Sequence, residues 1–240
     1  MIMESTPDIA VVIPCHEHAT ELVKTLAALS AQSLMPREVV VVDDGSTDRP
    51  EDVVAMFRDR LPITTIRFDV NRGAPAARNA GADATEAPFL LFLDADAELV
   101  PDALQTFHDA LDQHPEASFA YADFLWGAKR FRGRPFDRKA LERRNYIHTT
   151  SLLRREAFPG FDETLRKFQD WDLWLTMAER GTVGVWIDRD LFRIEPRTQG
   201  MSRWMPRIAH VIPWQKLGFV PKEISNYREA EDIVRKKHGI

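Results

Sequence analysis

The first half of this chain repeats one pattern four times: a short apolar run typical of a β-strand, then a segment whose apolar residues recur at helical spacing. The strand-like runs are residues 9–14, 38–43, 63–68 and 89–93. The helical segments that follow them are residues 22–29, 53–61, 74–84 and 101–114. Strands that alternate with helices in this way form parallel sheets covered by helices on both faces. The sequence therefore predicts an α/β fold with a Rossmann-like, mainly parallel sheet.

The composition narrows the class of protein further. With 240 residues, 44% of them hydrophobic, the chain is long enough for one large α/β domain or two halves that share a cleft. A net charge of −5 does not favour nucleic acid as a partner. The single cysteine, Cys15, excludes an intrachain disulfide and favours a reducing compartment. No signal peptide or membrane-spanning run of roughly 18 apolar residues stands out, so we expect a cytoplasmic protein, or one held peripherally at the inner face of a membrane.

A polar cluster follows each of the four predicted strands. The clusters occupy residues 14–17, 43–48, 71–73 and 94–96. In open α/β sheets, ligands bind outside the carboxyl ends of the strands. We therefore expect the four clusters to meet at one edge of the sheet and to form one site.

The most specific of these clusters is the pair Asp94 and Asp96. Alternate side chains of an extended segment point the same way, so both carboxylates can converge on one hard divalent cation. A cation would also offset the repulsion between them. The alternative is that the acids cap a helix that begins near Pro101.

Two other clusters have a nucleotide-binding interpretation. Asp44 can accept a hydrogen bond from a base edge such as the imide N–H of uracil, or it can belong to an ordinary turn or helix cap. Gly73 stands at a strand-to-helix junction, where backbone N–H groups favour an anion and where Arg72 and Arg78 add charged donors. The alternative is a glycine that only closes a turn between solvated arginines.

A candidate base lies at the start of a helix predicted at residues 170–180. Asp170 and Asp172 differ by a rotation of roughly 200°, so only one of them can face the cleft. For Asp170 the alternative is helix capping, which stabilises the anion, whereas a useful base wants some desolvation. The neighbouring aromatic side chains are expected to form core rather than a sugar-stacking platform; they are Phe161, Phe168, Trp171 and Trp174.

The rest of the second half has weaker patterns. Residues 129–144 carry eight basic side chains and predict a long mobile loop, or alternatively a contact for a phosphate-bearing or membrane-embedded acceptor. Strands are predicted at 149–154 and 183–187, a helical stripe from Trp204 to Ile212, and a final polar helix at 223–237. His16 and His18 are treated as polar residues near the cleft. The basic, aromatic region that begins at Arg203 leaves a membrane contact, a subunit contact and a cover over the core all open.

Six motifs stand in a characteristic order along the chain: VIPC, VVDDGSTD, NRG with ARNAG, FLDAD, GFDE and QDWD. Together they resemble the family 2 glycosyltransferases of the GT-A fold, over roughly residues 8 to 202. The resemblance implies a GT-A fold with an acceptor-side subregion. It also implies a nucleotide-sugar-binding half over residues 1–97, an acceptor-binding and catalytic half over 98–202, and a helical extension over 203–240.

The resemblance further implies roles for individual residues. Asp96, assisted by Asp94, would bind Mn²⁺ or Mg²⁺, and Asp170 would deprotonate the acceptor hydroxyl. The residues that would bind the nucleotide sugar are Pro14, Glu17, Asp44, Asn71, Gly73, Arg78, Asp94 and Ala95. Acceptor-side residues often stand at the positions of Thr149, Thr150 and Ser151.

Three positions depart from the family pattern. Glu17 stands where an asparagine is common, Gln169 where a glutamate usually precedes the base, and Glu195 where a histidine often lies near the phosphates. The last two changes remove expected groups from the neighbourhood of the base and of the C-terminal loop. The metal pair is unchanged.

The implied reaction is a single inverting displacement. A sugar would pass from a nucleoside-diphosphate sugar, with a UDP-sugar favoured, to a hydroxyl of a glycan, a lipid-linked compound or another acceptor. Arg78, Arg193 and Arg197 would supply further donors to the diphosphate. Two alternatives remain open: a non-catalytic homologue that binds nucleotides or glycans, and, less favoured, a metal-dependent phosphohydrolase with Asp94 as nucleophile.

Overall fold

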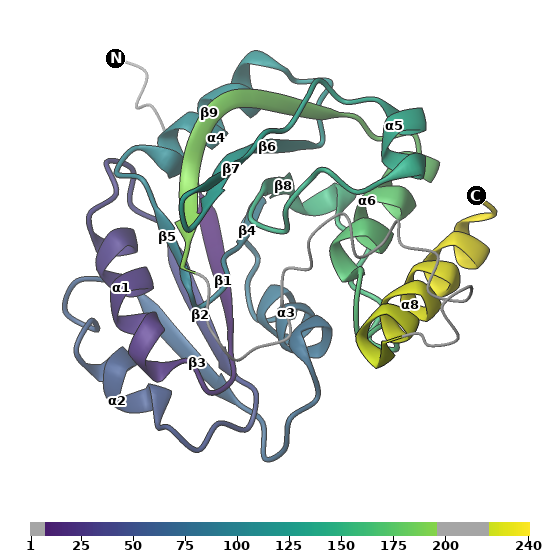
Figure 1. The fold of residues 1–240 in the computed structure, drawn as a ribbon. Helices are drawn as coiled ribbons and strands as arrows, with labels where there is room; N and C mark the ends of the chain where they lie inside the picture. Colours follow the sequence, from purple (N-terminus) through teal and green to yellow (C-terminus); the bar gives the residue numbers. More distant parts are fainter. Residues whose placement is uncertain (1–7, 196–220) are drawn as a thin grey trace.

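The computed structural model describes residues 8–195 and 221–240, which form one curved sheet with helices on both faces (Figure 1). The strands are β1 (Ile9–Cys15), β2 (Glu38–Asp43), β3 (Ile63–Arg67), β4 (Phe89–Phe92), β5 (Ala97–Leu99), β6 (Phe119–Trp126), β7 (Lys129–Phe131), β8 (Leu152–Arg154) and β9 (Gly184–Ile194). The helices are α1 (Ala19–Ser30), α2 (Pro50–Ala55), α3 (Ala74–Asp83), α4 (Ala103–Gln113), α5 (Arg138–Arg143), α6 (Gln169–Glu179) and α8 (Lys222–His238). All four predicted strand–helix repeats are present, although the second helix ends at Ala55 and does not extend over the predicted residues 53–61.

The order of strands in the sheet is β3-β2-β1-β4-β8-β6-β9-β5, and β7 pairs with β6 outside this path. The pairs β3·β2, β2·β1 and β1·β4 are parallel, as the strand–helix repeats predict. The second half is mixed: β8 runs antiparallel to β4 and β6, β6 and β9 are parallel, and β5 is antiparallel to β9. The α/β fold is therefore confirmed, with antiparallel pairs concentrated in the second half.

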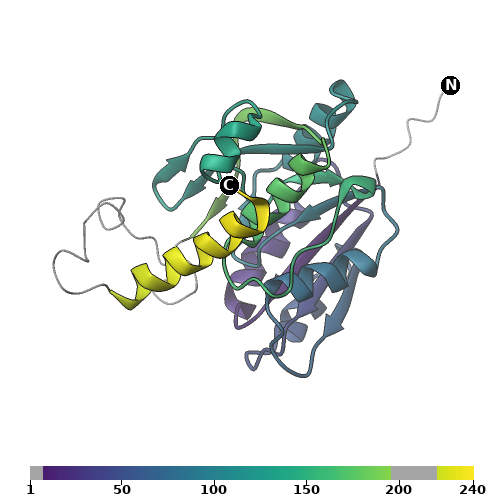
Figure 2. The ribbon, with the colours of Figure 1, turned by 90° about the vertical axis from the view of Figure 1, so that its right-hand side faces the viewer.

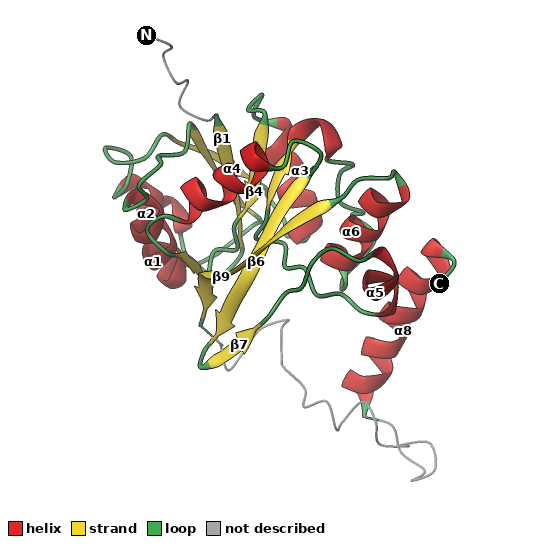
Figure 3. Cartoon of the chain, turned by 90° about the horizontal axis from the view of Figure 1, so that it is seen from above, coloured by secondary structure: helices red, strands yellow, loops and turns green. Residues whose placement is uncertain are grey.

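Both faces of the first strands are buried, which explains their unbroken apolar sequences. Alternate side chains of β1 point to opposite faces. Ile9, Val11 and Ile13 pack with side chains of α1, α2 and α4, whereas Ala10 and Val12 pack with those of α3, α5, α6 and α8. The view from above shows these two helical layers on either side of the strands (Figure 3).

A glycine sets how closely α3 approaches the sheet. A Cβ at Gly81 would lie 2.3 Å from Val12 Cγ1, closer than real side chains come. The missing side chain therefore lets α3 lie directly against β1. This contact fixes the position of Arg78, one turn earlier on the same helix.

The predicted mobile loop at residues 129–144 is wrong. Lys129–Phe131 forms β7, and Arg138–Arg143 forms α5, whose first turn is capped by a hydrogen bond from the Ala140 backbone N–H to Asp137 Oδ1 at 3.1 Å. Arg130 is held by Asp190, with 2.7 Å between its Nε and the carboxylate. These elements have three and six residues, too few for a periodic pattern to reveal them.

Helix α6 forms the centre of the second core cluster. Trp171 and Trp174 are buried, and their indole N–H groups donate to the backbone oxygens of Leu141 at 2.7 Å and Ile147 at 3.0 Å. The prediction that the aromatic side chains here form core is confirmed for both tryptophans and for Phe161, whereas Phe168 is partly buried.

Helix α8 confirms the predicted final helix and packs against α6 (Figure 2). Lys237 Nζ lies 2.7 Å and His238 Nε2 lies 2.9 Å from Asp172 Oδ1 on α6. The predicted stripe from Trp204 to Ile212, and Arg203, lie outside the described residues. No helix in the described ranges is both long and apolar enough to cross a membrane.

Candidate active site

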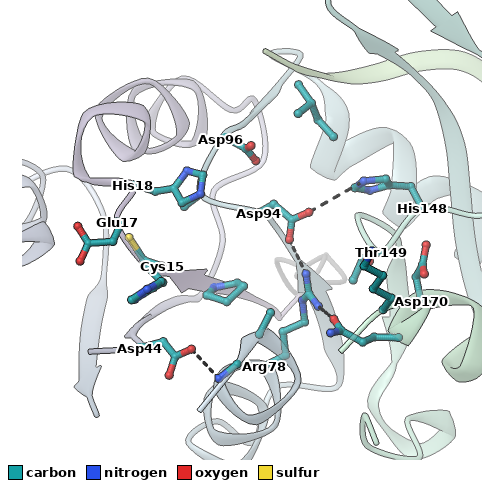
Figure 4. A pocket seen from close by; sticks show the side chains of 18 of the residues that line it. Cys15, Glu17, His18, Asp44, Arg78, Asp94, Asp96, His148, Thr149 and Asp170 are labelled. Carbon is teal, nitrogen blue, oxygen red and sulfur yellow. Dashed lines mark hydrogen bonds and ion pairs between the residues drawn. The ribbon is translucent and has the colours of Figure 1, made fainter. Parts of the chain in front are cut away.

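A cavity of about 730 Å³ opens where β1, β2 and β4 end (Figure 4). Its opposite wall is formed by the first turn of α6 and the end of β9. This is the edge at which α/β sheets bind ligands, and the volume is typical of a small-molecule site. The residues predicted for the nucleotide sugar, the metal and the base all line it: Pro14, Glu17, Asp44, Asn71, Gly73, Arg78, Asp94, Ala95, Asp96 and Asp170.

Other predicted residues divide between the cavity wall and the interior. Thr149, His16 and His18 line the cavity. Thr150 and Ser151 are fully buried and do not line it. Arg193 pairs with Glu195, at 2.8 Å between Nη2 and Oε1, and only Glu195 of the two lines the cavity. Arg197 lies outside the described residues.

Asp44 anchors the loop between β3 and α3. Its carboxylate is almost fully buried and accepts hydrogen bonds from the backbone N–H groups of Arg72 at 2.6 Å and Gly73 at 2.8 Å. Gly45 has φ +72°, and a Cβ there would lie 2.8 Å from the backbone nitrogen of Asn71. Asp44 therefore has the structural role in a turn that the sequence left open as an alternative. Because each carboxylate oxygen has a second lone pair, Asp44 can also accept a bond from a ligand.

Asp94 is held by a buried arginine. Arg78 of α3 donates to Asp94 Oδ1 at 2.6 Å and to Gln169 Oε1 at 3.3 Å, and it is only 6% exposed. Burial is the largest single influence and raises the pKa of Asp94, but the charge and hydrogen bond of Arg78, together with smaller effects of His148 and His18, outweigh it, and the net pKa lies below the ordinary value of aspartate. Arg78 therefore keeps Asp94 ionised and joins the two walls of the cavity.

The predicted metal-binding pair lies in a turn. Strand β4 ends at Phe92, so Asp94 and Asp96 occupy the turn before β5 instead of an extended strand end, and the geometric premise for the pair is corrected. Figure 4 shows Asp94 directed toward Arg78 and His148, while Asp96 lies on the side of His18.

The donor set of this turn fits a hard cation. Carboxylate oxygens suit Mg²⁺ and Mn²⁺, and Mg²⁺ keeps several waters when bound by one or two carboxylates and substrate phosphates. Within the described residues, no group of three or more His, Cys, Asp or Glu side chains is arranged to hold a metal. The carboxylates would therefore share the ion with water and phosphate oxygens.

Asp170 stands in the first turn of α6 and faces the cavity. Its Oδ2 accepts a hydrogen bond from Asn145 Nδ2 at 2.6 Å, and its Oδ1 accepts one from the Trp171 backbone N–H at 2.9 Å. Burial raises the pKa of Asp170 above its ordinary value, the direction expected of a base and opposite to that of a simple cap. Asp172 points instead to α8, so only one of the two acids faces the cleft, as the helical rotation predicts.

One cavity residue, His148, was not singled out from the sequence. It precedes β8 and packs against the stacked rings of Phe124 and Phe192, with centroid distances of 4.8 Å and 5.0 Å. Burial lowers the pKa of His148 to about 4, so the ring is neutral near pH 7. A lone histidine in a segment without a motif gave no signal, because the residues around it are distant in sequence.

Two basic residues on the cavity wall were also missed. Arg166 and Lys167 lie in the segment before α6. Among the described residues, neither has an ion pair or a side-chain hydrogen bond. The nearest acids along the chain are bonded elsewhere: Asp162 to Lys237, Glu163 to Asn79, and Asp170 to Asn145.

The departures from the family pattern have local partners. Glu17 accepts hydrogen bonds from the Thr47 backbone N–H at 2.8 Å and hydroxyl at 3.0 Å, and the backbone bond is the main cause that lowers the pKa of Glu17. Gln169 accepts from Arg78, as described above. Both residues thus organise the loops that line the cavity.

Solved structures share this architecture. TarS of S. aureus in complex with UDP-GlcNAc has a TM-score of 0.70 at 19% identity, over 95% of this chain and 71% of that one. The mannosyltransferase PcManGT of Pyrobaculum calidifontis, in complex with GDP-Man and Mn²⁺, has a TM-score of 0.66 at 21% identity, over 97% of this chain and 71% of that one. The fold is that of the GT-A glycosyltransferases.

The sequence comparisons narrow the class to a family. The family described as "Glycosyl transferase family 2" matches residues 10–163, more than half of the chain. The "PGL/p-HBAD biosynthesis glycosyltransferase" of Mycobacterium bovis is 30% identical over 175 residues, which are 70% of this chain and 68% of that protein. This chain belongs to glycosyltransferase family 2.

Other relatives are considerably longer than the matching segment. The validoxylamine A glucosyltransferase of Streptomyces hygroscopicus is 41% identical over 103 residues, which are 42% of this chain and 23% of that protein. An uncharacterised glycosyltransferase of Haemophilus influenzae is 32% identical over 113 residues, which are 47% of this chain and 37% of that protein. The match thus spans less than half the length of both relatives.

Proposed function

We propose that this chain transfers a sugar from a nucleoside-diphosphate sugar to an acceptor hydroxyl, with inversion at the anomeric carbon. The observation that carries this proposal is the placement of Asp170, with its raised pKa, in the same cavity as the turn that holds Asp94 and Asp96. A single displacement needs a base for the acceptor and a place for the leaving diphosphate, and the two walls supply one each.

The donor proposed here is a UDP-sugar. Asp44 at the end of β2 is the acceptor for a base edge, and the neighbouring loop at Asn71 and Gly73 lies beside it in the cavity. Support comes from TarS, which is seen with UDP and UDP-GlcNAc, whereas PcManGT is seen with GDP-Man. The proposal is therefore that the chain binds a nucleotide sugar, with uracil as the preferred base.

In the proposed mechanism, Asp170 accepts the proton of the acceptor hydroxyl as its oxygen attacks the anomeric carbon. The bond from that carbon to the diphosphate oxygen breaks at the same time, and the nucleoside diphosphate leaves with the bonding electrons. Asn145 orients the Asp170 carboxylate, and Arg78 holds Asp94 in its ionised form. A Mn²⁺ or Mg²⁺ ion bound by Asp96 and Asp94 would supply positive charge for the diphosphate.

The test is release of nucleoside diphosphate from a panel of nucleotide sugars with Mn²⁺ or Mg²⁺, in the wild type, Asp96→Asn and Asp170→Asn. We expect both substitutions to abolish transfer, while only Asp96→Asn weakens metal-dependent binding of the donor. Normal turnover by Asp170→Asn would remove Asp170 from the role of base. Binding of a nucleoside diphosphate without consumption of any sugar donor would favour a non-catalytic homologue.

A further inference from the structure

A hydrogen-bond donor and an acceptor face each other across part of the cavity. His148 Nε2 lies 4.0 Å from Asp94 Oδ2, and Figure 4 shows the two side chains directed at one another. This separation is too long for a hydrogen bond. In the part of the chain that the structure describes, neither of these two atoms has a hydrogen bond to another residue. Polar groups at such a distance call for a third group between them.

The donor is fixed by its surroundings. The Thr150 backbone N–H donates to His148 Nδ1 at 3.0 Å, so Nδ1 must carry a lone pair and the proton of the neutral ring lies on Nε2. The imidazole packs against the rings of Phe124 and Phe192, which stack on each other with centroids 4.9 Å apart, and this contact restricts its rotation. The Nε2–H group is therefore held in one direction, toward Asp94.

The acceptor is fixed as well. Arg78 occupies Oδ1 of Asp94 at 2.6 Å and leaves Oδ2 facing His148. A cation between the two groups would meet the positive end of the Nε2–H dipole, so this position does not suit a metal ion. A hydroxyl suits it, because one oxygen can accept from Nε2–H and donate to the carboxylate.

The distance matches such a group. Two hydrogen bonds of about 2.8 Å that meet at one oxygen at roughly a right angle span about 4 Å. The histidine and the carboxylate both line the cavity that also contains Asp96 and Asp170, within which a sugar attached to the diphosphate would lie. We propose that His148 and Asp94 together bind one hydroxyl of the sugar that is transferred, which makes His148 a determinant of donor specificity. This inference rests on the proposed function.

The test separates the sugar from the nucleotide. Calorimetric titrations with Mn²⁺ measure binding of UDP and of UDP-glucose, UDP-galactose, UDP-N-acetylglucosamine and GDP-mannose to the wild type and to His148→Phe. We expect His148→Phe to bind the preferred nucleotide sugar about 10- to 100-fold more weakly, because a buried partner of the hydroxyl is lost. Its affinity for the nucleoside diphosphate alone should stay within about twofold. A general structural defect would weaken both ligands alike.

Two further variants complete the design. His148→Gln keeps an N–H donor and should recover part of the affinity, which provides a second variant if the phenylalanine is poorly tolerated. His108→Phe is the matched control, since His108 also packs on an aromatic ring, at 5.3 Å from Phe89, and lies outside the cavity lining. It should bind both ligands like the wild type.

The outcomes are distinct. The inference is wrong, while the proposed function stands, if the wild type binds a nucleotide sugar and His148→Phe binds it equally well. The same holds if His148→Phe loses as much affinity for the nucleoside diphosphate alone as for the nucleotide sugar. If the wild type binds no nucleotide sugar of the panel, the proposed function fails and the inference fails with it. Donors that lack one hydroxyl would identify the group that is bound. The relevant monodeoxy donor should bind the wild type more weakly than the parent donor does, whereas His148→Phe should bind the two donors equally.

Discussion

The two walls of the cavity are built by different means. The wall of β1 to β4 consists of short loops directly after parallel strands, and it presents the carboxylates of Asp44, Asp94 and Asp96. The opposite wall combines the first turn of α6, the segment before it and the end of β9, and it presents the cations of Arg166 and Lys167, which have no ion pair among the residues that the structure describes. A diphosphate beside the first wall would need a cation to offset these carboxylates, whereas Arg166 and Lys167 on the opposite wall can attract an anion themselves, although Asp170 and Glu195 line the same wall.

The largest expected effect contrasts two acids on one helix. Asp170→Asn should lower kcat by about 10²- to 10⁴-fold through loss of the base, with little change in melting temperature. Asp172→Asn should leave kcat of the folded protein nearly unchanged but destabilise it by about 2–4 kcal/mol, because Lys237 and His238 lose their buried partner. Rate measurements and urea denaturation check both. Equal losses of kcat in the two variants would break the distinction between the cavity face and the α8 face.

The next effect concerns the link between the walls. Arg78→Met should cost about 2–4 kcal/mol of unfolding free energy, because it leaves the Asp94 carboxylate in a largely desolvated position without its cation. Arg72→Met is the matched control: its pair with Glu163, at 3.5 Å, is about half exposed on both sides and should contribute less than about 1 kcal/mol. Urea denaturation of both variants gives the comparison. Similar losses of unfolding free energy in the two variants would show that the buried pair of Arg78 with Asp94 stabilises the fold no more than the exposed pair of Arg72 with Glu163 does.

The pH profile should distinguish the walls directly. Asp170 must be ionised to act as base, and burial raises its pKa, so kcat should rise with pH over a range above the ordinary aspartate pKa of about 3.9. The pKa of Asp94 is lowered despite burial, because Arg78 and the neighbouring histidines together outweigh it, so Asp94 should stay ionised and its contribution to donor binding should persist over that range. Parallel measurements of kcat and donor affinity from pH 4 upward test this. If kcat and donor affinity fell together as the pH is lowered, Asp170 and Asp94 would not have the different environments described here.

The smallest expected effect concerns Arg166 and Lys167 on the opposite wall. The double substitution of Arg166 and Lys167 by Gln should reduce use of anionic acceptors several-fold while donor affinity stays the same, because both cations line the same cavity as Asp170, the proposed base. Matched acceptors such as glycerol and glycerol 3-phosphate, assayed with the preferred donor, provide the measurement. An increase in donor KM would place these cations on the diphosphate instead.

The wall of β1 to β4 was predictable from sequence because two simple rules cover it. Buried parallel strands give unbroken apolar runs, and their carboxyl ends meet at one edge. Residues 89–93 and the acids after them show both rules at once. Only the end of the strand was predicted wrongly. Strand β4 ends at Phe92, so Asp94 and Asp96 lie in a turn.

The opposite wall was less predictable because long-range contacts create it. Strand β6 was not predicted: its sequence contains Asp123, which is fully buried and bonded to the Trp186 indole and the Gly133 backbone N–H. Only the fold supplies those partners. His148 was missed for the same reason, since its environment comes from β6 and β9. Helix rotation predicted that only one of Asp170 and Asp172 faces the cleft, and the order of the motifs selected Asp170.

The sheet has one more property that bears on the acid turn. Strands β4 and β5 are joined by residues 93–96, yet β8, β6 and β9 stand between them in the sheet. Four hydrogen-bonded ladders and one covalent link thus make a closed ring of strands, and Asp94 and Asp96 sit on the link. In the ladder between β6 and β9, residues 188, 189 and 191 of β9 have no partner in β6 and form bulges. Deleting one of these bulge residues would shorten β9 and therefore strain the closed ring of strands. Because the ring has no free edge at which the strain could relax, it would be transmitted through the covalent link to Asp94 and Asp96.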